Sequence, residues 1–271
     1  MSSGDAGPGD RVAHGRSDGV RLAVGTLSVL PAPMPSTVDR AVAGQAMVLA
    51  PAIGLLLGGI AAGVVAGVHA LRPGAPLLAA VLGVVALTAL SGALHLDGLA
   101  DTADGLGSRR DRETMLRIMK QSDIGPFGVV SIVAVLLIDV AALTTCVQGG
   151  FGWQAILIAT VASRLTLPWS CRMSIQSARP DGLGAMVAGT VPTIAAAVTT
   201  AITTLIAVAL AWFTTSDNLV AAALAVLLAV VIGLLAVRRA RTAFGGITGD
   251  TLGATVELAL PAALLTLALV S

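Results

Sequence analysis

The chain runs from Pro73 to Leu94 without a charged residue and then reads His95-Leu96-Asp97-Gly98-Leu99-Ala100-Asp101-Thr102-Ala103-Asp104. An apolar run of this length can cross the hydrocarbon core of a bilayer as a helix. The aspartates that follow are spaced by four and then three positions, so a helix places them on one face. Because three carboxylates on one face repel each other, the pattern predicts a divalent metal there, with a phosphate attached to it.

The composition is that of a membrane protein. Of the 271 residues, 56% are hydrophobic and only 11% are charged. Inside lipid, only helices and closed barrels satisfy the backbone, and long apolar runs without strict alternation favour helices. We therefore predict an all-α polytopic membrane helix bundle with about seven transmembrane helices. Their expected positions are 46–68, 74–95, 126–146, 151–169, 190–213, 218–237 and 252–270.

The segment ahead of the first predicted span differs in character. Residues 1–20 are polar and rich in glycine, and we expect them to form a disordered extension. Residues 21–33 are apolar but too short to span a bilayer, so we expect a short interfacial or re-entrant helix there. Residues 21–271 are then expected to form a single membrane-embedded catalytic domain.

Basic residues are concentrated on alternate connections between the predicted spans. The N-terminal segment and the loops after 74–95, 151–169 and 218–237 hold 14 of the 16 Lys and Arg residues. The positive-inside rule places these regions and the N-terminus in the cytoplasm. The net charge of +1 argues against a nucleic-acid partner, and the sequence leaves open whether the protein forms an oligomer.

The acidic string is the first group of candidate catalytic residues. Hard carboxylate oxygens suit Mg²⁺, so Asp97, Asp101 and Asp104 are candidate metal ligands, and one of them could accept a proton from an attacking hydroxyl. The alternative is a solvated helix start, because Asp is also a common capping residue. His95 could orient a carboxylate or simply mark the membrane interface.

Two later motifs supply candidates for substrate binding. Lys120 and Ser122 stand just before a Gly-Pro-Phe-Gly helix start, close to the acidic string. Arg179 precedes a Gly-rich turn, which can present a guanidinium and free backbone N–H groups to an anion. Both motifs are also compatible with ordinary basic loops between membrane helices.

The last motif leads into the final predicted span. Gly246, Thr248 and Asp250 lie in a Gly-rich stretch at the start of a helix, where backbone and helix dipole favour phosphate. Asp250 is either a ligand or a cap of that helix. Glu257 lies inside the span, where an ionisable group is functional or paired, and Arg164 is its expected partner.

Every one of these motifs except the Arg164–Glu257 pair falls on the predicted cytoplasmic side, which is typical of an enzyme with a cytoplasmic substrate. A transporter would be expected to place its polar groups near the bilayer midplane. The sequence contains no Ser-His-Asp set, Cys–His metal site, Walker loop or dinucleotide fingerprint. Metal-assisted transfer on a phosphorylated substrate is the class that remains.

The acidic string from His95 to Gly105 resembles the hallmark of the cobalamin synthase family, the adenosylcobinamide-GDP ribazoletransferases. Three further stretches match the family in the same order, and the similarity covers about residues 20–271. The three stretches are 119–128 with Ile-Gly-Pro-Phe-Gly, 178–184 with Ala-Arg-Pro-Asp-Gly-Leu-Gly, and 245–254 with Gly-Gly-Ile-Thr-Gly-Asp-Thr-Leu-Gly-Ala.

The resemblance implies a reaction between adenosylcobinamide-GDP and α-ribazole or α-ribazole 5′-phosphate. GMP is released and adenosylcobalamin or its 5′-phosphate is formed, in the last assembly step of the nucleotide loop. It implies Mg²⁺ as cofactor and the bacterial inner membrane as location. It also implies that Lys120, Arg179 or Arg241 holds phosphates while the three aspartates bind the metal.

Two other function classes fit parts of the sequence. The first is another Mg²⁺-dependent membrane diphosphate transferase. A CDP-alcohol phosphotransferase is one example, but its signature has Arg where this chain has Asp101. A prenyltransferase is the other, but it needs a second acid-rich loop. A transporter could use the intramembrane residues Asp139, Arg164 and Glu257 as a relay.

Overall fold

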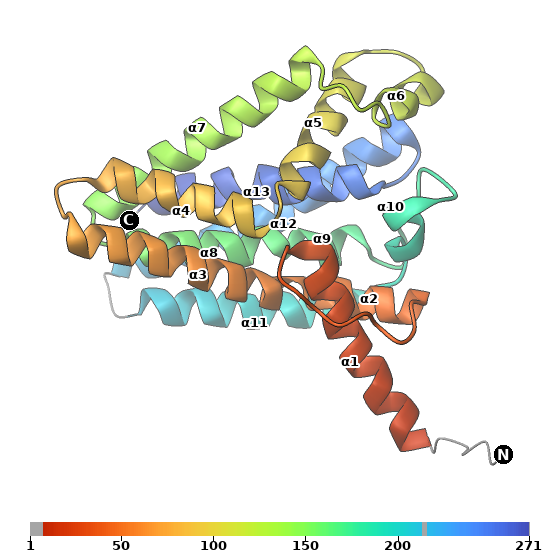
Figure 1. Cartoon of the computed structure of the whole chain (residues 1–271), viewed down its shortest axis with the longest axis horizontal. Helices are drawn as coiled ribbons and strands as arrows, with labels where there is room; N and C mark the ends of the chain where they lie inside the picture. Colours follow the sequence, from red (N-terminus) through yellow and green to blue (C-terminus); the bar gives the residue numbers. More distant parts are fainter. Residues whose placement is uncertain (1–7, 213–215, 271) are drawn as a thin grey trace.

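The computed structural model describes residues 8–212 and 216–270, and all regular structure in these ranges is helical (Figure 1). Within these ranges, two isolated backbone bridges connect loops. The predicted all-α class is therefore confirmed. The helices are α1 (Pro8–Leu27), α2 (Arg40–Val48), α3 (Ala50–Leu71), α4 (Pro76–Leu90), α5 (Leu94–Gly107), α6 (Arg112–Ile118), α7 (Pro126–Gln148), α8 (Gly152–Arg164), α9 (Thr166–Ser170), α10 (Gly182–Val187), α11 (Thr193–Ala211), α12 (Ser216–Phe244) and α13 (Gly249–Val270).

The number of helices that can cross a membrane is lower than predicted. Within the described ranges, five helices are long and apolar enough, namely α3, α7, α11, α12 and α13, and the bent pair α4–α5 counts as a sixth if taken as one span. The predicted span 151–169 is instead divided into α8 and the short α9. All of α8 except Trp153 is buried, because other helices of the bundle surround it. Hydropathy alone does not distinguish such a core helix from a lipid-facing one.

The predicted span 74–95 ends early and turns sharply. Helix α4 ends at Leu90, and α5 leaves it at an angle of 86°. Gly92 and Ala93 make the turn with φ values of 62° and 56°, in the left-handed region that residues other than glycine rarely adopt. Figure 1 shows α5 rising from the end of α4 toward α6. The acidic face therefore begins a new helix at the edge of the bundle.

Helix α1 occupies most of the segment expected to be disordered and part of the expected interfacial helix. It begins at Pro8 and ends at Leu27, and residues 1–7 lie outside the described ranges. A buried carboxylate ties it to the next loop, because Asp18 accepts hydrogen bonds from the backbone N–H and hydroxyl groups of Ser36 and Thr37. The hydrogen bonds from Ser36 hold the pKa of the Asp18 carboxyl well below its usual range, so it stays charged.

Glycines allow the helices around α5 and α13 to approach closely. A Cβ at Gly98 would lie 2.7 Å from the carbonyl oxygen of Asp250 in α13. A Cβ at Gly253 would lie 3.2 Å from the Cα of His95 in α5. Small residues are the usual means of close helix packing in membranes. This contact fixes the acidic face of α5 against the first turn of α13.

We predict that Gly98→Ala destabilises the protein. The added methyl group meets backbone atoms that cannot move aside alone, and such overpacking costs about 1–3 kcal/mol. Thermal unfolding of the purified protein in detergent measures the change. Gly59→Ala in α3 is the matched control, because a Cβ there meets nothing within 4 Å and should leave the melting temperature unchanged or slightly higher. Equal melting temperatures for the two variants would contradict the close contact.

Candidate active site

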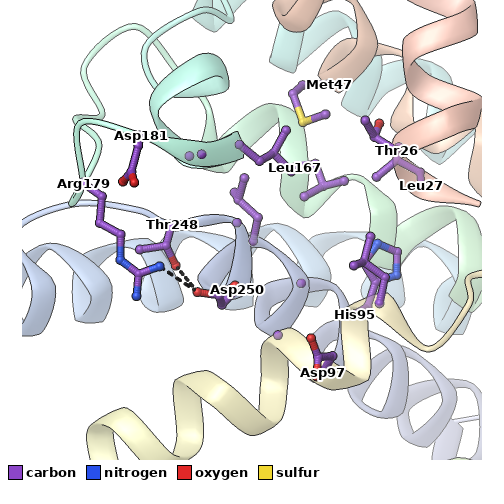
Figure 2. A pocket seen from close by; sticks show the side chains of 18 residues that line it. Thr26, Leu27, Met47, His95, Asp97, Leu167, Arg179, Asp181, Thr248 and Asp250 are labelled. Carbon is purple, nitrogen blue, oxygen red and sulfur yellow. Dashed lines mark hydrogen bonds and ion pairs between the residues drawn. The ribbon is translucent and has the colours of Figure 1, made fainter. Parts of the chain in front are cut away.

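A cavity of about 260 Å³ opens between α5, the start of α13, the loop before α10 and the ends of α1 and α2 (Figure 2). One side of it is polar and the other is apolar. The polar side is lined by His95, Asp97, Arg179, Asp181, Thr248 and Asp250. The apolar side is lined by Leu27, Met47, Leu94, Leu167, Leu183 and Leu252.

Two loops that are 70 residues apart in sequence form one wall of the cavity. Ser177 and Ile247 pair as an isolated parallel bridge. The backbone N–H of Ala178 donates to the carbonyl of Ile247 at 2.9 Å, and the N–H of Ile247 donates to the carbonyl of Gln176 at 3.0 Å. Gly246 has to be glycine here, because any Cβ would collide with the backbone of Gln176 and Ser177. The bridge thus carries Arg179 to the start of α13.

The first turn of α13 is capped by two threonines. The backbone N–H of Thr248 donates to the Thr251 hydroxyl at 2.8 Å, and the N–H of Thr251 donates to the Thr248 hydroxyl at 3.1 Å. This reciprocal arrangement satisfies N–H groups that the helix itself leaves unpaired. Since Thr248 is the cap, the carboxylate of Asp250 is available for contacts in the cavity.

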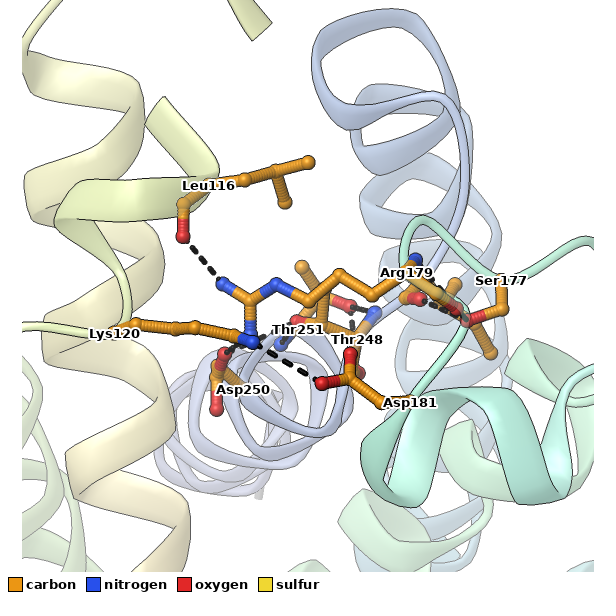
Figure 3. A network of polar contacts seen from close by, with 9 residues as sticks. Leu116, Lys120, Ser177, Arg179, Asp181, Thr248, Asp250 and Thr251 are labelled. Atoms are coloured by element: carbon orange, nitrogen blue, oxygen red, sulfur yellow. Dashed lines mark hydrogen bonds and ion pairs between the residues drawn. The ribbon is translucent and has the colours of Figure 1, made fainter. Parts of the chain in front are cut away.

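Arg179 connects three parts of the site (Figure 3). Its Nη2 donates to the carbonyl oxygen of Leu116 in α6 at 2.6 Å, and its Nη1 lies 3.4 Å from Oδ2 of Asp250. A second cation is close by, because Nζ of Lys120 lies 3.3 Å from Oδ2 of Asp181. Arg179 therefore faces the cavity beside Asp250, and Lys120 lies outside the lining beside Asp181, which does line it.

The three aspartates of the string do not share one environment. Asp97 is exposed to the cavity, and the negative charges of Asp97 and Asp250 act on the half-buried Asp101. Asp104 instead accepts the backbone N–H groups of Gly125 at 2.7 Å and Gly128 at 2.9 Å. It therefore caps the N-terminus of α7. Among the described residues, no group of three or more His, Cys, Asp or Glu side chains is arranged to hold a metal.

Of the residues proposed from the sequence, His95, Asp97, Arg179, Thr248 and Asp250 line this cavity, and Lys120 reaches it through Asp181. The others lie elsewhere. Ser122 is exposed and lies outside the lining. Gly246 also lies outside the lining and packs against the backbone of Gln176 and Ser177, next to the bridge. Arg241 lines a separate pocket on α12. Arg164 and Glu257 are buried inside the bundle, away from the cavity lining.

Arg164 and Glu257 belong to a buried charge cluster that also contains Asp139. The charge of Arg164 acts on both acids, and its Nη1 donates to the Ser163 hydroxyl at 3.0 Å. Asp139 and Glu257 line a cavity between α4, α7 and α13 of about 10 Å³, which is room for one water molecule. Neither carboxylate oxygen of Asp139 has a hydrogen-bond partner in the described part of the chain.

Several residues that line the cavity were not predicted from the sequence. The apolar wall from Leu27, Met47 and Leu167 gives no signal, because these residues look like any others in an apolar helix. Asp181 lies inside a motif that was recognised, but its pairing with Lys120 depends on how two distant loops fold together.

We predict that Asp104 and Asp101 respond differently to substitution. Asp104→Ala removes the acceptor for two N–H groups of α7 and should cost about 1 kcal/mol of stability, as lost helix caps do. Asp101→Asn removes one of several mutually repelling charges and should leave the melting temperature unchanged or raised. Thermal unfolding of both variants in the same detergent tests this. A loss for Asp101→Asn as large as that for Asp104→Ala would show that the two acids have the same role.

The chain matches one family over nearly its whole length. The family model described as Cobalamin-5-phosphate synthase matches residues 19–268. A relative from Frankia casuarinae, named adenosylcobinamide-GDP ribazoletransferase, is 42% identical over 261 residues, which cover 92% of this chain and 94% of the relative. A relative with the same name from Nocardioides sp. is 40% identical, over 92% of this chain and 97% of the relative. Another, from Corynebacterium efficiens, is 33% identical, over 95% of this chain and 91% of the relative. No solved structure matches the chain. The chain therefore belongs to the cobalamin-5-phosphate synthase family.

Proposed function

We propose that this protein is an adenosylcobinamide-GDP ribazoletransferase, the activity for which its relatives are named. A ribose hydroxyl of α-ribazole, or of its 5′-phosphate, attacks the phosphorus bound to the cobinamide. The bond from that phosphorus to the GMP oxygen breaks, GMP leaves, and the hydroxyl proton is released. The observation that carries this proposal is the cavity in which Arg179, the capped start of α13 and Asp97 of the acidic helix lie together beside apolar side chains, with Lys120 close by on Asp181.

The cations and the helix start are suited to the diphosphate. Guanidinium and ammonium groups bind phosphate oxygens through charge-assisted hydrogen bonds, and Arg179 and Lys120 provide one of each. The N-terminus of α13, a helix of 22 residues, carries the positive end of its dipole into the same cavity. The apolar wall offers a surface for the flat, weakly polar base of the ribazole.

Asp97 is the candidate proton acceptor. Among the three aspartates of α5, it alone lines the cavity. A carboxylate in that position can take the proton of a bound hydroxyl as the hydroxyl attacks phosphorus. Asp101 lies one helical turn further along α5, where the negative charges of Asp97 and Asp250 act on it.

The donor set also fits Mg²⁺, which we include in the proposal. Asp97, Asp101 and Asp250 offer carboxylate oxygens whose charges act on one another. Mg²⁺ is usually held by one or two carboxylates together with substrate phosphates, so a preformed cage of three ligands is not required. When bound, the ion would neutralise charge on the phosphate oxygens and polarise the phosphorus. Asp104 is left out of this set because it caps α7.

The apolar helices make this a membrane protein, and we propose the bacterial inner membrane as its location. The positive-inside distribution supports cytoplasmic placement of the N-terminus and of the cavity, because the loops that line it carry most of the basic residues. Both substrates are water-soluble phosphorylated or ribosylated molecules, and they would reach the cavity from that side.

A turnover assay on the protein in lipid nanodiscs tests the activity. The protein receives adenosylcobinamide-GDP, Mg²⁺ and either α-ribazole or α-ribazole 5′-phosphate, and GMP release is followed by chromatography. We expect GMP and a cobalamin product in equal amounts, and no release in EDTA. Absence of GMP with both ribazole forms, from protein shown to be folded, would refute the proposal.

Variants of Asp97 and Asp101 then test the assignment of roles. We expect Asp97→Asn and Asp101→Asn to lower kcat/KM by roughly 100-fold or more, because each removes a charged group at the reacting centre. Asp123→Asn is the matched control, since Asp123 is exposed and lies outside the cavity lining. If either of these two α5 variants retained the turnover of the control at saturating Mg²⁺, the role assigned to that aspartate would be wrong.

A further inference from the structure

A second pocket, of about 490 Å³, lies at the end of α12 and shares no residue with the cavity described above. Three arginines line it, Arg172 from the segment after α9, and Arg238 and Arg241 from α12. The remaining surface is mainly aliphatic, from Ile175, Leu234 and Val237. The family resemblance implies Arg241 as one of three candidate phosphate ligands for the substrate, but its position separates it from the candidate active site.

The arginines of this pocket carry no carboxylate partner within the described ranges. Arg172 is held in place by a hydrogen bond from its Nε to the carbonyl of Trp169 at 3.1 Å, and its guanidinium lies 4.9 Å from the centre of the Trp169 ring. Arg238 and Arg241 are three residues apart on α12, so they project from the same side of the helix. Arg238 and Arg241 are exposed and Arg172 is half-buried, so water screens part of their mutual repulsion, and an anion between them would relieve the rest.

The pocket lies at the end of α12, an apolar helix long enough to cross a membrane, with exposed apolar side chains. Along α12, exposed side chains such as Leu227 (58% exposed) and Leu235 (60% exposed) lead toward the arginines. Trp169, beside Arg172, is of the residue type that gathers at the boundary between membrane and water. An anion bound here would therefore have water on one side and hydrocarbon on the other.

We infer that this pocket binds the phosphate head group of an anionic phospholipid. Guanidinium groups pair with phosphate oxygens in two-point contacts, and basic pockets between membrane helices are suited to anionic head groups. The aliphatic part of the lining, continuous with the exposed face of α12, accommodates the start of the acyl chains. A soluble phosphate compound also carries negative charge, but it has no acyl chains to contact that apolar surface.

Lipid-dependent stability tests the inference. The wild-type protein, Arg238→Gln/Arg241→Gln and Arg239→Gln are each placed in nanodiscs of phosphatidylcholine alone or with one quarter phosphatidylglycerol, and melting temperatures are compared. Arg239→Gln is the matched control, since Arg239 has the same charge on the same turn but does not line the pocket. We expect phosphatidylglycerol to raise the melting temperature by about 3 °C or more in the wild type and in Arg239→Gln, but not in the double variant.

Three outcomes would overturn the inference. The first is an equal effect of phosphatidylglycerol on the double variant and the control. The second is the same rise with inorganic phosphate in phosphatidylcholine discs, which would identify a soluble anion as the ligand. The third is an effect that does not shrink in high salt, measured on the wild type alone, so the test holds even if the double variant fails to fold.

Discussion

The backbones of α5 and α13 meet at two glycines, and the rest of the site depends on this contact. Gly98 lies against Asp250, and Gly253 lies against His95, so the two backbones come close at these two positions. Because helix positions one turn apart point the same way, this contact fixes where Asp97 and Asp101 stand relative to the start of α13. The 86° turn between α4 and α5 delivers the acidic helix to that position.

The opposite wall is held by hydrogen bonds between loops and not by helix packing. The bridge between Ser177 and Ile247 joins the segment that carries Arg179 to the segment that begins α13. Because Thr248 caps the N-terminus of α13, Asp250 does not have to accept the backbone N–H groups there, as an aspartate at a helix start often does. Asp104, by contrast, caps the N-terminus of α7. Acids of similar sequence context thus divide between capping a helix and facing the cavity.

Sequence reasoning recovered the parts of the site that depend on local pattern. The helical class, the acidic face and the Gly-rich stretches follow from hydropathy and spacing, and Asp97, Arg179 and Asp250 do lie around one cavity. What it missed depends on packing between distant segments. The break that divides 151–169 into α8 and α9 has no signal in the sequence, and the position of Arg241 depends on the direction of α12. Asp104 has a role different from that of Asp97 because it contacts the start of α7.

The contact between Arg179 and Asp250 has a consequence for how ligands compete. An anion that bound the guanidinium of Arg179 would compete for it with Asp250, whose Oδ2 lies 3.4 Å from Nη1. The carboxylate released in this exchange is one whose charge already acts on Asp101. An anion that displaced Asp250 from Arg179 would leave more uncompensated negative charge near Asp101 and would raise the affinity for a cation there. By thermodynamic reciprocity, a cation bound there strengthens the hold on the anion.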